Sequence, residues 1–459
     1  KRLEIGNHVE QTNLIFFLIT LFSCELLEKN DSEVTFSKNI QYNTYVPKSN
    51  DLVISRNNYY DKLYGFWLGQ SIGNWTGLIT EMDKIGNIGN IKTGDFYTRD
   101  NWGAVDQPNI WSKDFSKLDT LVKIDFVFKE KNEVWGSDDD TDIEYMYQHL
   151  IYNNSSILTS EQIRDGWLNH IMEEEENYLW VSNQKAFDLM KQGILPPKTS
   201  SVDLNEHYEM IDAQLTTEIF GLLAPGREDF ALKMSYLPIR TTARYNAAWI
   251  SEFYVLMHSL ASKVDNNLSM KDKLMWMADE SRKILPKGSY SSKMYDFVKS
   301  KYESKISWEQ TRDSIYIRYQ VNQKDGYKIT SQNLNCNGCF AAGINFASSL
   351  VSLFYGEGDL KQTIKIGTLS GWDSDNPTAT WGGLLGFMIG KNKIEKIFDK
   401  EFSNKYNIHR TRRNFPNNGM DTFENMAQKG IFIIDKVVQS DMNGGISKSK
   451  NIWYIPQIN

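Results

Sequence analysis

The chain has 459 residues, of which 41% are hydrophobic and 13% aromatic, which is ample for a large folded core and excludes a disordered chain. Its formal net charge of -7 argues against a general nucleic-acid or anionic-membrane surface, because such surfaces need a basic excess. We therefore expect one large globular domain with no nucleic-acid partner.

The first 24 residues have the pattern of an export signal. Residues 14–22 are mostly apolar, but the run is far shorter than the roughly 20 residues that a membrane-spanning helix needs. The following segment, Leu21-Phe22-Ser23-Cys24, resembles a bacterial lipobox, in which the cysteine carries the lipid after cleavage. We predict an exported protein whose only membrane contact is a lipid on Cys24. A secreted protein and a buried N-terminal helix are the alternatives.

Composition predicts the remaining boundaries. Residues 25–50 are rich in Asn, Ser and Lys and predict a polar tether. The folded domain is expected over 51–459, with an insertion at about 85–135 and a C-terminal extension at about 400–459. Within the insertion, residues 121–128 partly alternate between apolar and polar side chains, which predicts a strand in a small hairpin.

Glycines recur every four residues in the first folded segment, from Tyr60 to Glu81. They stand at positions 65, 69, 73 and 77. In a helix such glycines line one side and let another backbone approach closely. Because glycine destabilises an isolated helix, this side must pack against a neighbour or a ligand. Glu81 ends the run, where a solvated helix-end residue is the ordinary interpretation.

The first acidic block is Ser137-Asp138-Asp139-Asp140-Thr141-Asp142, directly before a helical pattern. Apolar side chains follow at helical spacing, at Ile143, Met146, Tyr147, Leu150 and Ile151. The block therefore predicts a helix with an acidic N-terminus.

The second acidic block, Asp373-Ser374-Asp375-Asn376-Pro377, also precedes a helical pattern. On an extended segment side chains two apart point the same way, so Asp373 and Asp375 can converge, and two converging carboxylates need a cation. Asn376 suits the N-cap. The glycines that follow, up to Gly386, give the helix a face that can pack closely. Taken alone, an acidic loop that caps an ordinary helix is the alternative.

Cysteine and histidine do not indicate a zinc site. Cys336 and Cys339 form a lone C-x-x-C pair, and the six histidines are scattered. The two cysteines predict either a disulfide or two small buried side chains. The carboxylate blocks favour oxygen-binding ions such as Mg, Mn or Ca.

Three further groups have two interpretations each. Asp212, Gln214 and Glu218 lie on a predicted helix and either face a cleft or give it ordinary polarity. The basic segment Arg410-Thr411-Arg412-Arg413 either meets phosphate or forms surface salt bridges. The aromatic side chains of the insertion either stack on a ligand ring or pack in a satellite core; these are Tyr97, Trp102, Trp111 and Trp135. In the tail, residues 431–434 and 452–455 predict a small pair of strands.

Three motifs, in order, resemble the ADP-ribosylglycohydrolase family, which includes the dinitrogenase-reductase-activating glycohydrolases. Gly73-Asn74-x-x-Gly77-x-x-x-Glu81 is similar to the family's Gly-Asp-x-x-Gly-x-x-x-Glu motif. Asp138-Asp139-Asp140-Thr141 is similar to its Thr-Asp-Asp-Thr block, and Asp373-x-Asp375-Asn376 to its Asp-x-Asp-Thr block. The resemblance extends from about Tyr59 to Lys391.

The sequence departs from the family at Asn74, Asp138 and Asn376, although an oxygen ligand remains at each ligand position. A second register places Ser137 at the hydroxyl ligand, followed by Asp138 and Asp139. These departures bear on substrate preference more than on metal binding.

The resemblance implies an all-α fold, an orthogonal multi-helix bundle with two Mg ions, or Mn, in a central cleft. It implies metal ligands at Asp138, Asp139, Asp140, Asp373, Asp375 and Asn376. It implies catalytic roles for Glu81, Asp139 and Asp375, and substrate contacts at Gly73, Asn74, Gly77 and Ser374.

The implied activity is hydrolysis of an ADP-ribosyl or related N- or O-ribosyl bond, with two cations that orient the ribose diol and activate water. A nearby carboxylate assists as general acid or base. The alternatives are hydrolysis of another sugar conjugate by the same machinery, and a catalytically silent surface domain that binds nucleotide-sugars or partners. We expect a monomer.

Overall fold

The computed structural model describes residues 34–89, 91–110, 122–173, 177–328, 336 and 338–458. The predicted export signal, its Cys24 and the start of the predicted tether lie outside the described residues, as does Trp111. Within the described ranges, no helix combines the length and the apolar character needed to span a bilayer.

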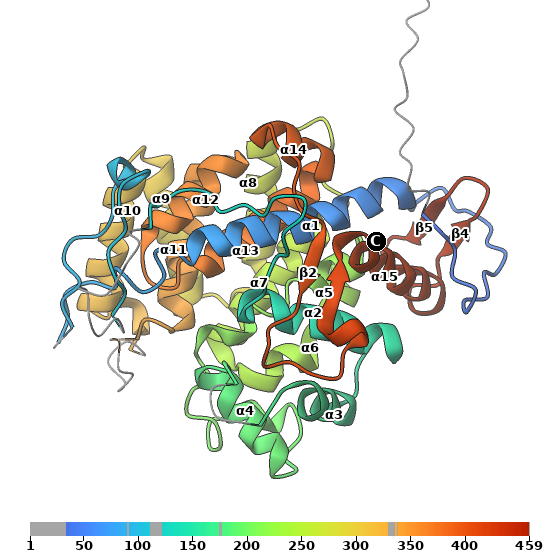
Figure 1. The fold of residues 1–459 in the computed structure, drawn as a ribbon, viewed down its shortest axis with the longest axis horizontal. Helices are drawn as coiled ribbons and strands as arrows, with labels where there is room; N and C mark the ends of the chain where they lie inside the picture. Colours follow the sequence, from blue (N-terminus) through green and yellow to red (C-terminus); the bar gives the residue numbers. More distant parts are fainter. Residues whose placement is uncertain are drawn as a thin grey trace, which may run out of the picture. The chain divides into compact units, whose positions relative to one another are not determined.

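The described chain is mainly helical, so the predicted all-α fold is confirmed (Figure 1). The α-helices are α1 (Arg56–Gly77), α2 (Asp139–Asn153), α3 (Ser160–His170), α4 (Val181–Lys191), α5 (Ile219–Leu223), α6 (Glu228–Thr242), α7 (Tyr245–Leu260), α8 (Met270–Ser281), α9 (Tyr290–Glu303), α10 (Trp308–Ile315), α11 (Ala342–Gly356), α12 (Leu360–Ser370), α13 (Asp375–Ile389), α14 (Lys391–Phe398) and α15 (Phe423–Lys436). The short strands are β1 (Asp51–Ser55), β2 (Lys405–Asn407), β3 (Met420–Thr422), β4 (Gly445–Ser447) and β5 (Ile452–Pro456).

Helices α1 and α13 lie side by side in the middle of this bundle (Figure 1). A methyl group added at Gly69 would overlap the carbonyl oxygen of Gly382, and one added at Gly386 would overlap that of Gly65. The predicted close approach of two backbones is therefore confirmed. The helices run antiparallel, with the C-terminal end of α1 at Gly77 beside the start of α13.

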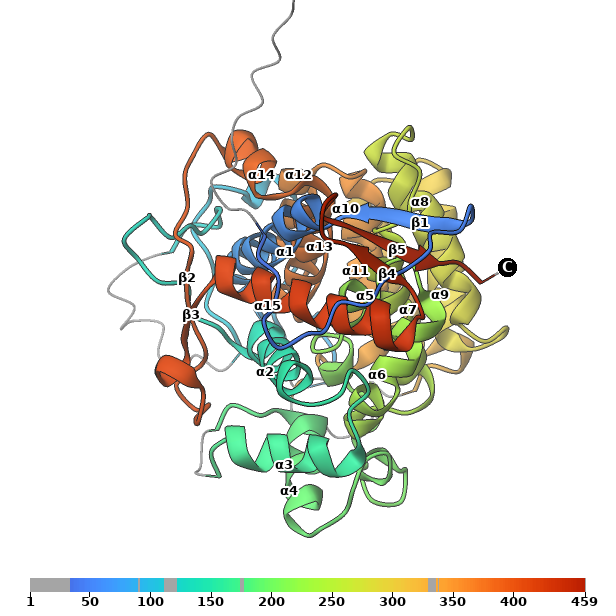
Figure 2. The same ribbon diagram turned by 90° about the vertical axis from the view of Figure 1, so that its right-hand side faces the viewer.

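The first and last strands join the two ends of the described chain. β1 pairs antiparallel with β5, and β5 with β4, in the order β1-β5-β4. This sheet lies beside α15 (Figure 2). A hydrogen bond joins the two, in which the indole of Trp453 in β5 donates to the Asp435 carboxylate of α15 at 2.7 Å. Arg56 at the start of α1 is buried and pairs with the same carboxylate at 2.8 Å.

The later part of the predicted tether, residues 34–50, is attached to the domain instead of hanging free. The Tyr42 hydroxyl donates to Asp435 at 2.8 Å, and the Thr35 carbonyl accepts from Arg56 at 3.1 Å. Gln439 donates to the Gln41 carbonyl at 2.6 Å. The predicted tether is thus only partly correct, because residues 34–50 form hydrogen bonds with α1 and with the end of α15.

Two strand predictions need correction. Residues 431–434 belong to α15, because the apolar run continues upstream at helical spacing, at Phe423, Met426 and Ala427; only 452–455 form the predicted strand. In the insertion, the described residues 122–128 form no strand. Ile124 exchanges backbone hydrogen bonds with residues 103 and 104, but the Val127 amide donates to the Thr76 hydroxyl of α1 at 3.1 Å, so the pairing stops.

Candidate active site

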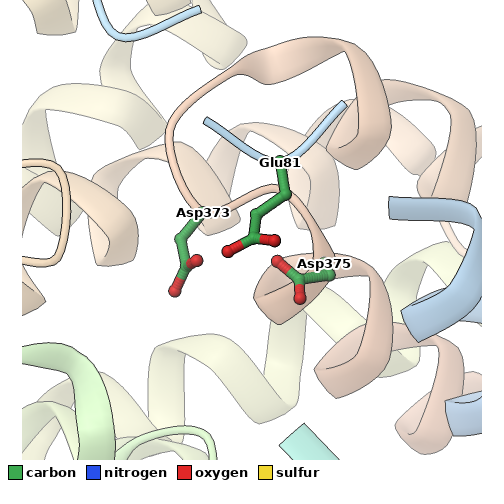
Figure 3. Close-up of side chains that lie close together, drawn as sticks. All are labelled: Glu81, Asp373 and Asp375. Atoms are coloured by element: carbon green, nitrogen blue, oxygen red, sulfur yellow. The ribbon is translucent and has the colours of Figure 1, made fainter. Parts of the chain in front are cut away.

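Glu81, Asp373 and Asp375 meet where α1 ends and α13 begins. Figure 3 shows the three carboxylates turned toward one another, and one oxygen of each lies within 4.8 Å of the others. The two segments are joined by backbone bonds, because the Met82 amide donates to the Trp372 carbonyl at 2.9 Å. The close packing of α1 on α13 therefore brings Glu81 to the second acidic block.

Asp138, Asp139 and Asp140 form a second cluster at the start of α2, again with one oxygen of each within 4.8 Å of the others. Asp138 is the N-cap, and its side chain accepts from the Asp140 amide at 3.3 Å. Carboxylates are favoured at this end of a helix, where the unpaired amides carry partial positive charge.

Two asparagines connect these clusters to each other and to α1. The Asn376 amide donates to Asp140 at 3.1 Å, which links the two acidic blocks directly. Since α13 begins one residue earlier, at Asp375, Asn376 is not the helix cap that was predicted. The Asn74 amide donates to Asp138 at 2.6 Å.

Both clusters reach one cavity of about 810 Å³, which Glu81, Asp138, Asp139 and Asp375 all line. The structure thus brings together carboxylates from three distant parts of the chain. Asp140 and Asp373 are buried beside them.

Burial and mutual repulsion raise the pKa values of these groups. The pKa of Asp140 lies well above its usual value because of burial and then the charge of Asp375. For Glu81 the causes of the raised pKa are again burial and then Asp375. Burial, followed by Asp139, raises the pKa of Asp138 to about 7. So many close carboxylates require either protons or cations to offset their charge.

A model of the ADP-ribosylglycohydrolase family matches residues 55–413, which include both carboxylate clusters. The chain belongs to the ADP-ribosylglycohydrolase family. Membership suggests hydrolase activity on ADP-ribose-type substrates. A solved structure titled as an ADP-ribosylglycohydrolase-related protein complex is similar, with 13% identity, a TM-score of 0.46, and coverage of 82% of this chain and 98% of that chain. The search of curated proteins found no match.

The residues of this family member that were predicted to contact substrate lie behind the cavity wall. Gly73 and Gly77 face the backbone of α13 at its first turn. The Ser374 hydroxyl is buried and donates to the Gly77 carbonyl at 2.9 Å. Asn74 is fully buried and orients Asp138. These four residues therefore build and orient the site, and their predicted contact with substrate stays a prediction.

The polar residues predicted on one helix around 212–218 lie instead on a 3-10 turn (Ile211–Ala213) and its continuation into α5. Gln214 donates to the Asn376 amide oxygen at 3.4 Å, so it supports the site from behind. Asp212 accepts from the Ser182 hydroxyl at 2.7 Å, and Glu218 from Thr380 at 2.6 Å. None of the three lines the cavity.

Most of the other residues that line the cavity of this family member are not marked by any motif in the sequence. Its aromatic and cationic lining comes from Trp75, Tyr178, Trp180, Phe340, His409, Arg410 and Arg412. Arg412 is not a surface residue, because it is buried and pairs with Asp142 at 2.9 Å. The described aromatic residues of the insertion named above do not line the cavity. Cys336, which does, forms a disulfide with Cys339.

Proposed function

We propose that the chain is a divalent-metal-dependent hydrolase that cleaves an ADP-ribosyl or related ribosyl bond. The observation that carries the proposal is the convergence of Glu81, Asp373 and Asp375 with the Asp138–Asp140 cluster on one cavity. Family membership supplies the class of substrate.

The donor set fits Mg, and Mn would suit it as well. Every candidate ligand in the two clusters is a carboxylate oxygen, the type of ligand that hard divalent cations prefer. One oxygen of Asp375 is buried without a hydrogen-bond donor among the described residues, as expected of an atom intended for a cation. Asp138, Asp139 and Asp140 would hold one ion, and Asp373 and Asp375 another.

Bound cations of this kind supply Lewis-acid polarisation of a sugar diol and help to ionise water. The protein's own groups do the rest. Glu81 lines the cavity, and burial followed by the charge of Asp375 raises the pKa of its carboxyl well above the usual value. A carboxyl with a raised pKa in such a position suits a general acid or base. The amide groups of Asn74 and Asn376 fix the orientation of Asp138 and Asp140, so the ligands do not need to reorganise during turnover.

The test is release of ADP-ribose from a labelled conjugate by purified protein, with Mg and with EDTA. We expect release that EDTA abolishes and Mg restores. Glu81→Gln should lower kcat by about 100-fold or more, as loss of a general acid or base does, while ADP-ribose binding persists. Glu303→Gln, on an exposed helix end, is the matched control.

Two results would contradict the proposal. Full turnover in EDTA would exclude the metal role. ADP-ribose binding without turnover of any ribosyl conjugate would favour the silent binding domain instead.

A further inference from the structure

Beside the carboxylates, the cavity is lined by an aromatic and cationic group that we call the rim, consisting of Tyr178, Trp180, His409 and Arg410. The Arg410 guanidinium lies 4.7 Å from the centre of the Tyr178 ring and donates to its hydroxyl at 2.8 Å. The Tyr178 ring lies 5.0 Å from His409 and 6.2 Å from Trp180, edge-on in both cases. The rim is therefore one contiguous group built from two distant segments.

The backbone that carries Trp180 is held in an unfavourable conformation. Tyr178 and Val181, on either side of it, have positive φ values of 55° and 36°. Such angles cost energy in residues with a Cβ and persist where the surroundings enforce them, often at ligand sites. The indole remains 50% exposed at the cavity, instead of packing into the core like most tryptophans of this chain.

Arg412 fixes the rim to the helix that carries the first carboxylate cluster. Its guanidinium donates to the Asn177 carbonyl at 2.7 Å, directly before Tyr178, and pairs with Asp142 of α2. The Thr411 hydroxyl also donates to the Asn177 carbonyl, at 2.8 Å. Rim and carboxylates are thus held in one relative position.

The rim has the opposite charge to the rest of the cavity. Arg410 makes no ion pair with a carboxylate among the described residues, whereas the charge of Arg412 is offset by Asp142. Burial lowers the pKa of His409 to about 4, so this ring is neutral at pH 7. An anionic group in the cavity would be repelled by Glu81, Asp139 and Asp375, and Arg410 offers it a planar partner suited to phosphate.

We propose that the rim is the nucleotide-recognition part of the cavity, where Trp180 stacks on the base and Arg410 pairs with a phosphate. Trp180 and Arg410 are then the specificity-determining residues. The inference rests on the proposed function. A substrate whose ribosyl bond lies at the carboxylates would place its base and phosphate at the rim only if that substrate is a nucleotide conjugate. Base stacking on an exposed aromatic side chain and a charge-assisted bond to phosphate are the two interactions that such a surface provides.

The experiment measures binding of three small probes in EDTA, so that no metal contributes: AMP, adenosine and ribose 5-phosphate. Trp180→Ala should weaken AMP and adenosine by about tenfold or more, as loss of one stacking partner does. Arg410→Gln should weaken AMP and ribose 5-phosphate but leave adenosine within about twofold. The matched control is Arg413→Gln, in the same segment but outside the cavity lining.

The outcomes separate this inference from the proposed hydrolysis. AMP affinity that neither rim substitution changes by more than about twofold would overturn the inference, whether or not the protein hydrolyses ribosyl bonds. Rim-dependent AMP binding in a protein without turnover would uphold the inference and refute the hydrolase. Asp375→Asn should stop turnover but should not weaken metal-free AMP binding, because it removes one of the negative charges that repel the phosphate.

Discussion

Asn74 occupies the position at which the family motif has a carboxylate. Its amide can donate a hydrogen bond, which a carboxylate cannot. It donates to Asp138 at 2.6 Å, so it orients that carboxylate without adding another negative charge. Asn376 does the same for Asp140 at 3.1 Å. These substitutions are visible in the sequence, but their partners are not, because each hydrogen bond joins residues on different helices.

A second carboxyl pair, Glu144 and Glu218, lies buried in the core beyond the cavity. Gln70 donates to Glu144 at 2.5 Å, and burial raises the pKa of Glu218 to about 7. A folded-state pKa above the usual value means that the folded state binds the proton more tightly than the unfolded state. Stability from this group is therefore full below pH 4.5 and is lost as the pH rises through about 7.

We expect Glu218→Gln to reduce the loss of stability between pH 5 and pH 8. The amide keeps a partner for Thr380 and stays neutral, so the variant should gain up to about 3 kcal/mol over the parent at pH 8 and little at pH 5. The measurement is urea unfolding in EDTA at both values. An equal difference from the parent at pH 5 and pH 8 would show that Glu218 does not titrate in this range.

At the scale of elements, the antiparallel contact of α1 with α13 positions the Glu81, Asp373 and Asp375 cluster. We expect Gly69→Ala to cost roughly 3 kcal/mol of unfolding free energy, because the new methyl group meets the backbone of Gly382, which cannot move aside. The same variant should bind Mg more weakly, since α13 carries Asp375. Denaturant unfolding and a Mg titration measure the two effects.

Gly166→Ala in α3 is the comparison for this variant. Its added methyl group meets only the Leu150 side chain, which can rotate, so the cost should stay within about 1 kcal/mol. Equal losses of unfolding free energy in the two variants would contradict the prediction that the backbone contact of α1 with α13 makes Gly69 the more sensitive position.

Predictions of helices and strands succeeded where the sequence pattern extended over many residues and failed where it covered only a few. The glycine spacing over 65–77 predicted a close helix contact, which α13 supplies. The four-residue apolar window 431–434 fits a strand or a helix equally well, and only the upstream residues of α15 decide between them. Residues 122–128 partly alternate between apolar and polar side chains, as a strand does. Their backbone, however, partly forms a hydrogen bond with the Thr76 side chain of α1, and no local sequence pattern indicates that partner.

At the scale of the whole molecule, the cavity combines segments that lie hundreds of residues apart. Motif resemblance predicted the two acidic blocks and Glu81, because these residues are concentrated in short runs. It did not predict the pairing of Arg412 with Asp142, or the rim from 178–180 and 409–410, because nothing in either segment alone indicates the other. Taken alone, the basic segment indicates either a phosphate contact or a surface salt bridge.

The central claim is that the two carboxylate clusters bind divalent cations together, and calorimetric titration of Mg into EDTA-treated protein tests it most directly. We predict two Mg ions per chain. Asp139→Asn and Asp375→Asn should each weaken binding by about tenfold or more, as loss of a charged ligand does, and Asp203→Asn on an exposed turn should not. No Mg binding at millimolar concentration, or binding that neither substitution alters, would contradict the account.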